Sequence, residues 1–198
     1  MNDEFANTAN ADPGAGSGPD ASADPDLPAA PASPGRRAAL YGVMVALALV
    51  AGYVEMLVPA PVAIPGVKLG LGNIVVLFAL ERMGARPAFL LMLAKVGCSA
   101  VLFGNPQVFA FSLAGGVVSW SVMALAVRSG EFSCVATSVL GGISHNAGQL
   151  VMVALMLSTQ VALATAPILA VAGAVCGFVI GIAVRAVLRA VPKEIVHG

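Results

Sequence analysis

Long apolar stretches, separated by short breaks, make up almost the whole chain from Leu40 onward. A helix needs about 20 apolar residues to cross a hydrocarbon core of about 30 Å. Six stretches meet or approach that length: residues 40–58, 69–85, 87–103, 108–127, 136–157 and 166–188. Only 10% of all residues are charged, whereas a soluble protein has about 25%. The sequence therefore predicts an all-α integral membrane protein, a bundle of about six transmembrane helices.

The stretch 69–85 is the weakest of these six candidates. It is short, and Gly70 and Gly72 stand near its start. Glycine inside a helix costs about 1 kcal/mol relative to alanine. A tilted, a broken and a partly re-entrant helix are all compatible with this segment.

The first part of the chain has a different composition, rich in Asp, Pro, Ala, Gly and Ser. No Lys or Arg precedes Arg36. Such a segment buries too little apolar surface to offset the entropy lost on folding. We expect residues 1–37 to form a disordered acidic cytoplasmic tail and residues 38–198 to form the six-helix transmembrane domain.

The basic residues predict the orientation of the bundle. With six crossings, eight of them fall on one side: Arg36, Arg37, Arg82, Arg86, Arg128, Arg185, Arg189 and Lys193. The connections on the other side, at residues 59–67, 104–107 and 158–165, contain neither Lys nor Arg. Basic residues are retained in short cytoplasmic loops. Both ends of the chain are therefore expected in the cytoplasm, and an odd number of crossings would break this segregation.

Two ionisable residues lie near the middle of predicted spans, Lys95 in the third and His145 in the fifth. Such residues cost at least roughly 2.5 kcal/mol to insert and usually face a bundle interior or a cavity. Spans three and five run in the same direction, so we expect both residues at similar depth in one polar cavity. Spans two to six contain no mid-membrane carboxylate to neutralise Lys95. The cavity is therefore suited to an anionic ligand.

Other polar residues extend this candidate site and leave alternatives open. Asn146 and Gln149 accompany His145, and the three together are equally compatible with hydrogen bonds that hold the helices together. Nearer the outer surface, Lys68 and Asn73 follow a proline-rich run. In one interpretation this run closes over a pocket with Lys68 at its mouth. In the other, Lys68 extends to the interface and pairs with Glu55.

Small residues recur at every fourth position of the first span, at Ala38, Gly42 and Ala46. Such a stripe lets two helix backbones approach closely in lipid. It predicts either packing inside the bundle or a docking face for another membrane subunit.

Catalytic chemistry is disfavoured by the residue types that are missing. No Asp follows Asp26, so the membrane domain lacks the Asp clusters that hold magnesium and a diphosphate in prenyl transfer. A GxxxxGK[ST] phosphate loop is also absent from the sequence. We expect no enzyme activity, no metal site and no cofactor.

Several motifs resemble the Gx transporter family, which is also catalogued as heptaprenyl diphosphate synthase component I. They are Pro-Gly-Val-Lys-Leu-Gly-Leu-Gly-Asn-Ile at 65–74, Leu-Phe-Gly at 102–104, Ser-Leu-Ala-Gly-Gly at 112–116 and His-Asn-Ala-Gly-Gln-Leu at 145–150. The likeness covers nearly everything after the tail. It departs at Gly72, where the family has Ala, and at Lys95, where it has Arg.

The size, the loop after span one and the small-residue stripe are also similar to S components of energy-coupling factor (ECF) importers. This resemblance implies a bacterial plasma membrane protein that captures a small polar or anionic substrate from outside and docks on a transmembrane coupling subunit with associated ATPases. The docking residues would be Ala38, Gly42 and Ala46. The substrate-binding residues would be Lys68, Asn73, Lys95, His145, Asn146 and Gln149.

The catalogue name implies an alternative, a non-catalytic membrane partner of a heptaprenyl or polyprenyl diphosphate synthase in isoprenoid quinone biosynthesis. A third hypothesis, a purely structural membrane scaffold, gives no role to a central lysine. None of the three involves nucleic acid.

Overall fold

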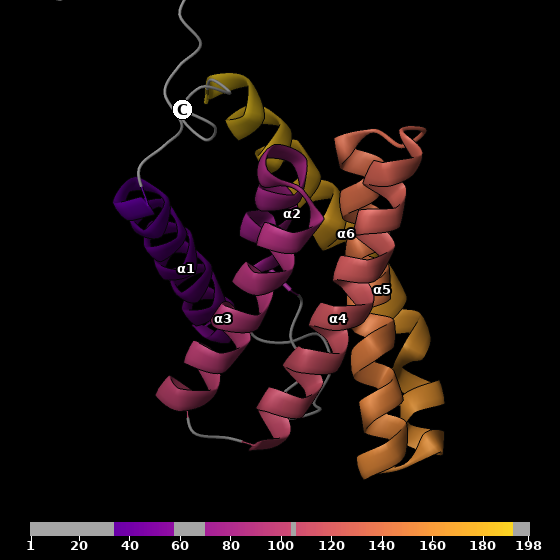
Figure 1. Cartoon of the computed structure of the whole chain (residues 1–198). Coiled ribbons are helices and arrows are strands. Elements are labelled where there is room, and N and C mark those ends of the chain that lie inside the picture. Colours follow the sequence, from indigo (N-terminus) through magenta and orange to yellow (C-terminus); the bar gives the residue numbers. More distant parts are fainter. Residues whose placement is uncertain (1–33, 58–69, 104–105, 192–198) are drawn as a thin grey trace, which may run out of the picture. The chain divides into compact units, whose positions relative to one another are not determined.

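The computed structural model describes residues 34–57, 70–103 and 106–191, all within the unit Pro31–Gly198. These residues form helices and contain no strand (Figure 1). The helices are α1 (Pro34–Leu57), α2 (Asn73–Met83), α3 (Ala85–Phe103), α4 (Pro106–Ser129), α5 (Cys134–Met156) and α6 (Thr159–Ala190). The prediction of an all-α membrane bundle is confirmed. The expected tail, residues 1–37, lies outside the described residues except for its last four.

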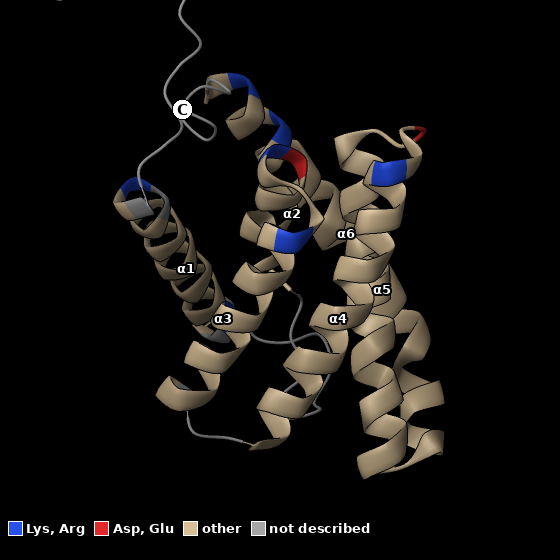
Figure 2. Ribbon diagram, viewed as in Figure 1, with Lys and Arg blue, Asp and Glu red and all other residues tan. Residues whose placement is uncertain are grey.

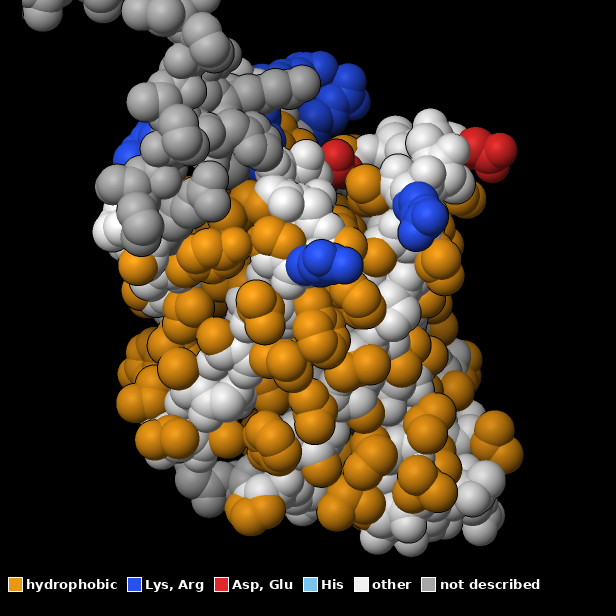
Figure 3. Space-filling model, in the orientation of Figure 1, with side chains coloured by type: hydrophobic (Ala, Val, Ile, Leu, Met, Phe, Trp, Pro, Cys, Tyr) orange, Lys and Arg blue, Asp and Glu red, His pale blue; other side chains and the backbone are white. Residues whose placement is uncertain are grey.

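Four helices are long and apolar enough to cross a bilayer, judged by length and composition: α3, α4, α5 and α6. Helix α1 contains a shorter apolar stretch, Ala38–Val54. Many large hydrophobic side chains on these helices are exposed, with Val101 at 85% and Leu155 at 76%. Figure 3 shows hydrophobic side chains over most of the visible face. An apolar surface of this extent suits contact with lipid.

Helix α2 is shorter than the expected span 69–85. It has 11 residues and is about 16 Å long at 1.5 Å per residue, too short to cross a core of about 30 Å. It begins only at Asn73, because a turn at Gly70, with φ of +87°, precedes it. It ends at Gly84, whose φ is +92° and whose N–H donates to the carbonyl of Ala79. Of the alternatives that the sequence left open for residues 69–85, the structure shows a short helix preceded by a turn, and the number of crossings stays a prediction.

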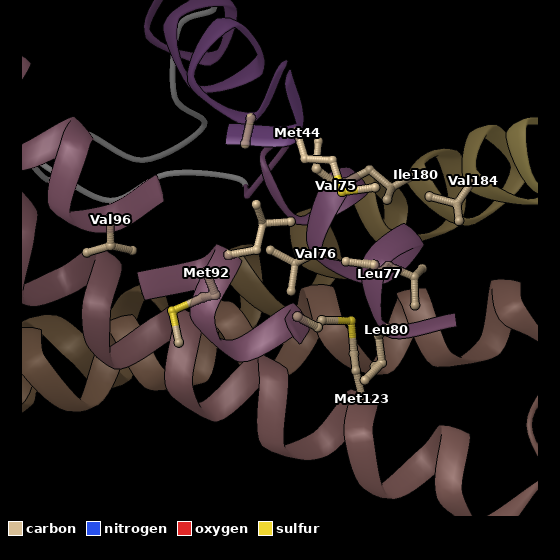
Figure 4. Close-up of a cluster of buried hydrophobic side chains, with 14 residues drawn as sticks. Met44, Val75, Val76, Leu77, Leu80, Met92, Val96, Met123, Ile180 and Val184 are labelled. Carbon is tan, nitrogen blue, oxygen red and sulfur yellow. The ribbon is translucent and has the colours of Figure 1, made fainter. Parts of the chain in front are cut away.

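The core of the bundle surrounds α2. Its residues Val76 and Leu77 are 1% and 0% exposed, and they pack among side chains from α1, α3, α4 and α6 (Figure 4). Met44, Met92 and Ile180 belong to the same cluster. Because α2 is enclosed by other helices, its apolar sequence reflects burial in protein as well as membrane insertion. This packing fixes the Gly70–Asn73 turn inside the bundle.

Glycines bring α4, α5 and α6 into backbone contact. A Cβ placed on Gly148 of α5 would lie 2.7 Å from the carbonyl oxygen of Ala114 on α4. A Cβ on Gly173 of α6 would lie 2.6 Å from the carbonyl oxygen of Gly142 on α5. Real side chains do not fit at such distances, so only glycine permits this packing. Helices α4, α5 and α6 therefore form a closely packed three-helix group beside α1, α2 and α3.

Apart from Lys95 in the middle of α3, the basic residues of the described helices gather at one end (Figure 2). They lie where α1 begins, where α2 ends and α3 begins, and where α4 and α6 end. Arg82 of α2 donates hydrogen bonds to the carbonyls of Leu188 and Val191, the latter at 2.7 Å. The ends of α2 and α6 therefore meet, as the predicted topology requires. We keep the cytoplasmic location of this end as a prediction.

Candidate ligand-binding site

A small cavity lies between α1, α3, α4, α5 and the turn before α2. Its volume is about 30 Å³, and its walls come from Ala48, Leu49, Gly52, Gly70, Gly72, Lys95, Val96, Ser99, Ser112 and His145. Two of the residues that the sequence predicts for a polar site, Lys95 and His145, thus reach one cavity from α3 and α5. The space holds roughly a water molecule or two as it stands.

Lys95 owes its position to a glycine. A Cβ on Gly72 would lie 2.7 Å from the Lys95 Nζ and 3.1 Å from its Cδ, so the side chain runs directly along the Gly72 backbone. Lys95 is half-buried. Gly72 and Lys95, the two positions at which the sequence is expected to differ from the family it resembles, are therefore in contact with each other. The smaller residue at 72 leaves room for the lysine chain.

His145 is held between two other glycines and is 3% exposed. A Cβ on Gly70 would approach its Cδ2 to 3.1 Å, and a Cβ on Gly115 would approach its Cε1 to 2.9 Å. One turn along α5, the amide Nε2 of Gln149 lies 3.1 Å from the imidazole Nε2. An amide nitrogen is a donor, so this hydrogen bond favours the neutral ring with its proton on Nδ1. Gln149 thus orients His145 from behind the cavity.

Asn73 supports the turn and does not line the cavity. Its N–H donates to the carbonyl of Gly70 at 2.8 Å. Its side-chain Nδ2 donates to Ser119 Oγ at 3.4 Å, and that hydroxyl donates to the carbonyl of Gly141 at 2.8 Å. This chain of hydrogen bonds connects α2, α4 and α5. It holds the glycines that contact Lys95 and His145 in place.

Asn146 faces a different neighbour. Its Nδ2 donates to the carbonyl of Leu169 on α6 at 2.7 Å, and the side chain is 1% exposed. Its Oδ1 is buried and has no hydrogen-bond partner among the described residues. On an α-helix the next residue is rotated by about 100°, so Asn146 turns to α6 while His145 faces the cavity. Its role in ligand binding stays a prediction.

The remaining predicted residues fall into two groups. Lys68 lies outside the described residues, as does the side chain of Glu55. The three residues of the α1 stripe, Ala38, Gly42 and Ala46, are exposed. A Cβ on Gly42 would meet no atom within 4 Å. Within the described part of the chain, nothing covers this stripe at Gly42.

Most residues that line the cavity are missing from the predicted set, among them Ser112, Ala48 and Gly52. Ser112 could have been found from the sequence, because it is the first residue of the Ser-Leu-Ala-Gly-Gly motif. Gly115 of the same motif contacts His145. Ala48 and Gly52 are spaced four apart and face the cavity from α1. No group of three or more His, Cys, Asp or Glu side chains comes together among the described residues in a way that would hold a metal ion.

Comparison with known proteins gives one finding. A family model described as heptaprenyl diphosphate synthase component I matches residues 44–187. The matched segment includes every residue that lines the cavity and omits Ala38 and Gly42 of the stripe. No curated protein and no solved structure matches the chain.

Proposed function

The chain belongs to the heptaprenyl diphosphate synthase component I family, and from this premise we propose that it is a non-catalytic membrane subunit that captures a small polar or anionic molecule. The binding site is the cavity between α3, α5 and the turn before α2. In this proposal the protein acts like the S component of an ECF importer. It takes its substrate from outside and docks through α1 on a coupling subunit with ATPases.

The observation that carries this proposal is the convergence of Lys95 and His145 on one cavity within the bundle. A lysine ammonium is a suitable donor to an anionic group. A carboxylate or phosphate of a ligand that enters the cavity would accept charge-assisted hydrogen bonds from Lys95. Ser99 and Ser112 add hydroxyl donors to the same walls. In this proposal a ligand displaces the Lys95 side chain from Gly72 and thereby enlarges a cavity of about 30 Å³.

A second candidate function is supported more directly by the family description. Here the chain is the non-catalytic membrane partner of a heptaprenyl or polyprenyl diphosphate synthase in isoprenoid quinone biosynthesis. The sequence supports a non-catalytic role, because no Asp beyond Asp26 is present to hold magnesium and diphosphate. In this candidate the catalytic residues come from the partner protein.

Native mass spectrometry of the full chain, purified in a mild detergent from its own membranes, separates the candidates. A retained small molecule supports the importer subunit. A co-purifying prenyl synthase without a retained molecule supports the second candidate and contradicts the first. If the purified chain retains neither a small molecule nor a prenyl synthase, the structural scaffold is the remaining hypothesis.

The variant Lys95→Gln tests the site itself. We expect it to lower the retained fraction of ligand about tenfold or more, because a hydrogen bond to a charged group is worth about 1.5–3 kcal/mol. Arg86→Gln is the matched control, since Arg86 is exposed at the start of the same helix and outside the cavity. Unchanged ligand retention in Lys95→Gln would contradict the proposed site.

A further inference from the structure

A second, larger cavity is an apolar groove between α1, α2 and α6. Its volume is about 390 Å³, and all its lining residues are hydrophobic: Leu40, Val43, Met44, Leu47, Ile74, Val75, Phe78, Val184, Val187 and Val191. Met44 forms part of its floor and is 4% exposed, whereas Val43 and Val187 on its walls are 58% and 44% exposed. The groove is therefore open along its length. It offers no polar group to a water-soluble ligand.

Arginines mark one end of this groove. Arg36 precedes the lining residue Leu40 by one turn of α1, and Arg82 follows the lining residue Phe78 by one turn of α2. Residues four apart share a helix face, so both arginines continue the lining faces. Arg82 also donates to the carbonyl of Val191, which lines the groove at the same end. The only acidic residue of α2, Glu81, does not line the groove.

Arg82 keeps hydrogen-bonding capacity at this position. Its Nη2 donates to the two carbonyls at the end of α6. Its buried Nε has no hydrogen-bond partner among the described residues. Arginine carries five N–H donors and binds phosphate in a bidentate manner. The guanidinium is therefore held by α6 at the end of the groove, with one N–H that has no partner among the described residues.

The length of the groove identifies the occupant. From Leu40 to Leu47 it extends about 10 Å along α1. That fits within one leaflet, which is about 15 Å thick, and is too short for a transmembrane helix of a partner. An acyl chain in the groove with an anionic headgroup at the arginines satisfies both the apolar walls and the charge. Basic sites between membrane helices bind anionic lipid headgroups in this way.

We propose that this groove is a binding site for one anionic phospholipid. An acyl chain lies along α1, α2 and α6, and the headgroup phosphate pairs with Arg82 and Arg36. The bound lipid fills the space between α1 and α6 and holds α1 against the bundle. This proposal is independent of the importer function and of the prenyl synthase function.

The test uses the full chain, exchanged into detergent and titrated with phosphatidylglycerol or with phosphatidylcholine. We expect one phosphatidylglycerol adduct in native mass spectra and a larger rise in the thermal unfolding temperature with phosphatidylglycerol than with phosphatidylcholine. Val187→Trp fills the groove from an exposed position, and we expect it to weaken phosphatidylglycerol binding at least tenfold. Arg36→Gln should weaken it about threefold to tenfold and abolish the preference over phosphatidylcholine.

Arg36→Gln and Val187→Trp are preferred because Arg82→Gln also removes the hydrogen bonds to α6 and risks loosening its end. Arg86→Gln is the control, a basic residue at the same end of the bundle that lies outside the groove. Equal binding of the two lipids would overturn the proposal. Unchanged phosphatidylglycerol binding in Val187→Trp, or retention of a prenyl diphosphate in place of phospholipid, would overturn it as well.

Discussion

Two helices of this protein carry a stripe of small residues at every fourth position, and the stripes differ in what covers them. On α6, Gly173, Gly177 and Gly181 are buried against the backbone of α5. On α1, Ala38, Gly42 and Ala46 are exposed. The same spacing thus lies in a helix–helix contact on α6 and on an uncovered surface on α1. A stripe of small residues indicates that a backbone can approach closely, but not which backbone it is.

The largest effect is expected at the covered stripe, from Gly177→Leu. A Cβ at this position would lie 2.6 Å from the carbonyl oxygen of Ser138 and 2.8 Å from the Cα of Val139. Backbone atoms cannot move aside as a flexible side chain can, so α5 and α6 must separate. We expect a loss of about 3 kcal/mol in the free energy of unfolding. Thermal unfolding in detergent measures it, and wild-type stability would show that the two helices are not packed as described.

The next effect is expected at the open stripe, from Gly42→Leu. A side chain here meets open space in the isolated chain, so stability should not fall, and the higher helix propensity of Leu should raise it by about 0.5 kcal/mol. If the stripe docks on a coupling subunit, the added side chain keeps the helices apart and abolishes co-purification of that subunit. Val50→Met, on an exposed position of the same helix, is the control. Unchanged assembly of Gly42→Leu would contradict the docking proposal.

Hydropathy predicted the all-α membrane bundle, and there is a physical reason why it left the structure of residues 69–85 open. A continuous apolar sequence looks the same whether lipid or protein surrounds it. Helix α2 is apolar because Val76, Leu77 and Leu80 are enclosed by neighbouring helices, and the Gly70 turn delays its start to Asn73. Helices α3, α4, α5 and α6 have both the apolar composition and the length to cross a bilayer, as the sequence predicts.

Helix periodicity predicted which residues of the candidate site share a helix face, but not which helices pack against them. The sequence predicted one cavity for Lys95 and His145, and both residues line the same cavity in the structure. Periodicity could not show that Asn146 bonds to α6, because that depends on which helix packs on which side. Gly70, Gly72 and Gly115 stand in motifs of the family resemblance, but the sequence did not show that they contact Lys95 and His145. Their partners are distant in sequence and become visible only in the packed bundle.

The smallest effect is expected from replacing a glycine by alanine in each stripe. The free energy of unfolding should rise at the open stripe and fall at the covered one. Gly42→Ala adds a methyl group in open space and removes backbone freedom from the unfolded chain, so we expect a gain of about 0.5–1 kcal/mol. Gly173→Ala places its methyl group 2.6 Å from the Gly142 carbonyl oxygen, and the strain should exceed that gain. Thermal unfolding of both variants in one detergent decides the matter. A shift of the same sign in both would mean that the two stripes do not differ in how they are covered.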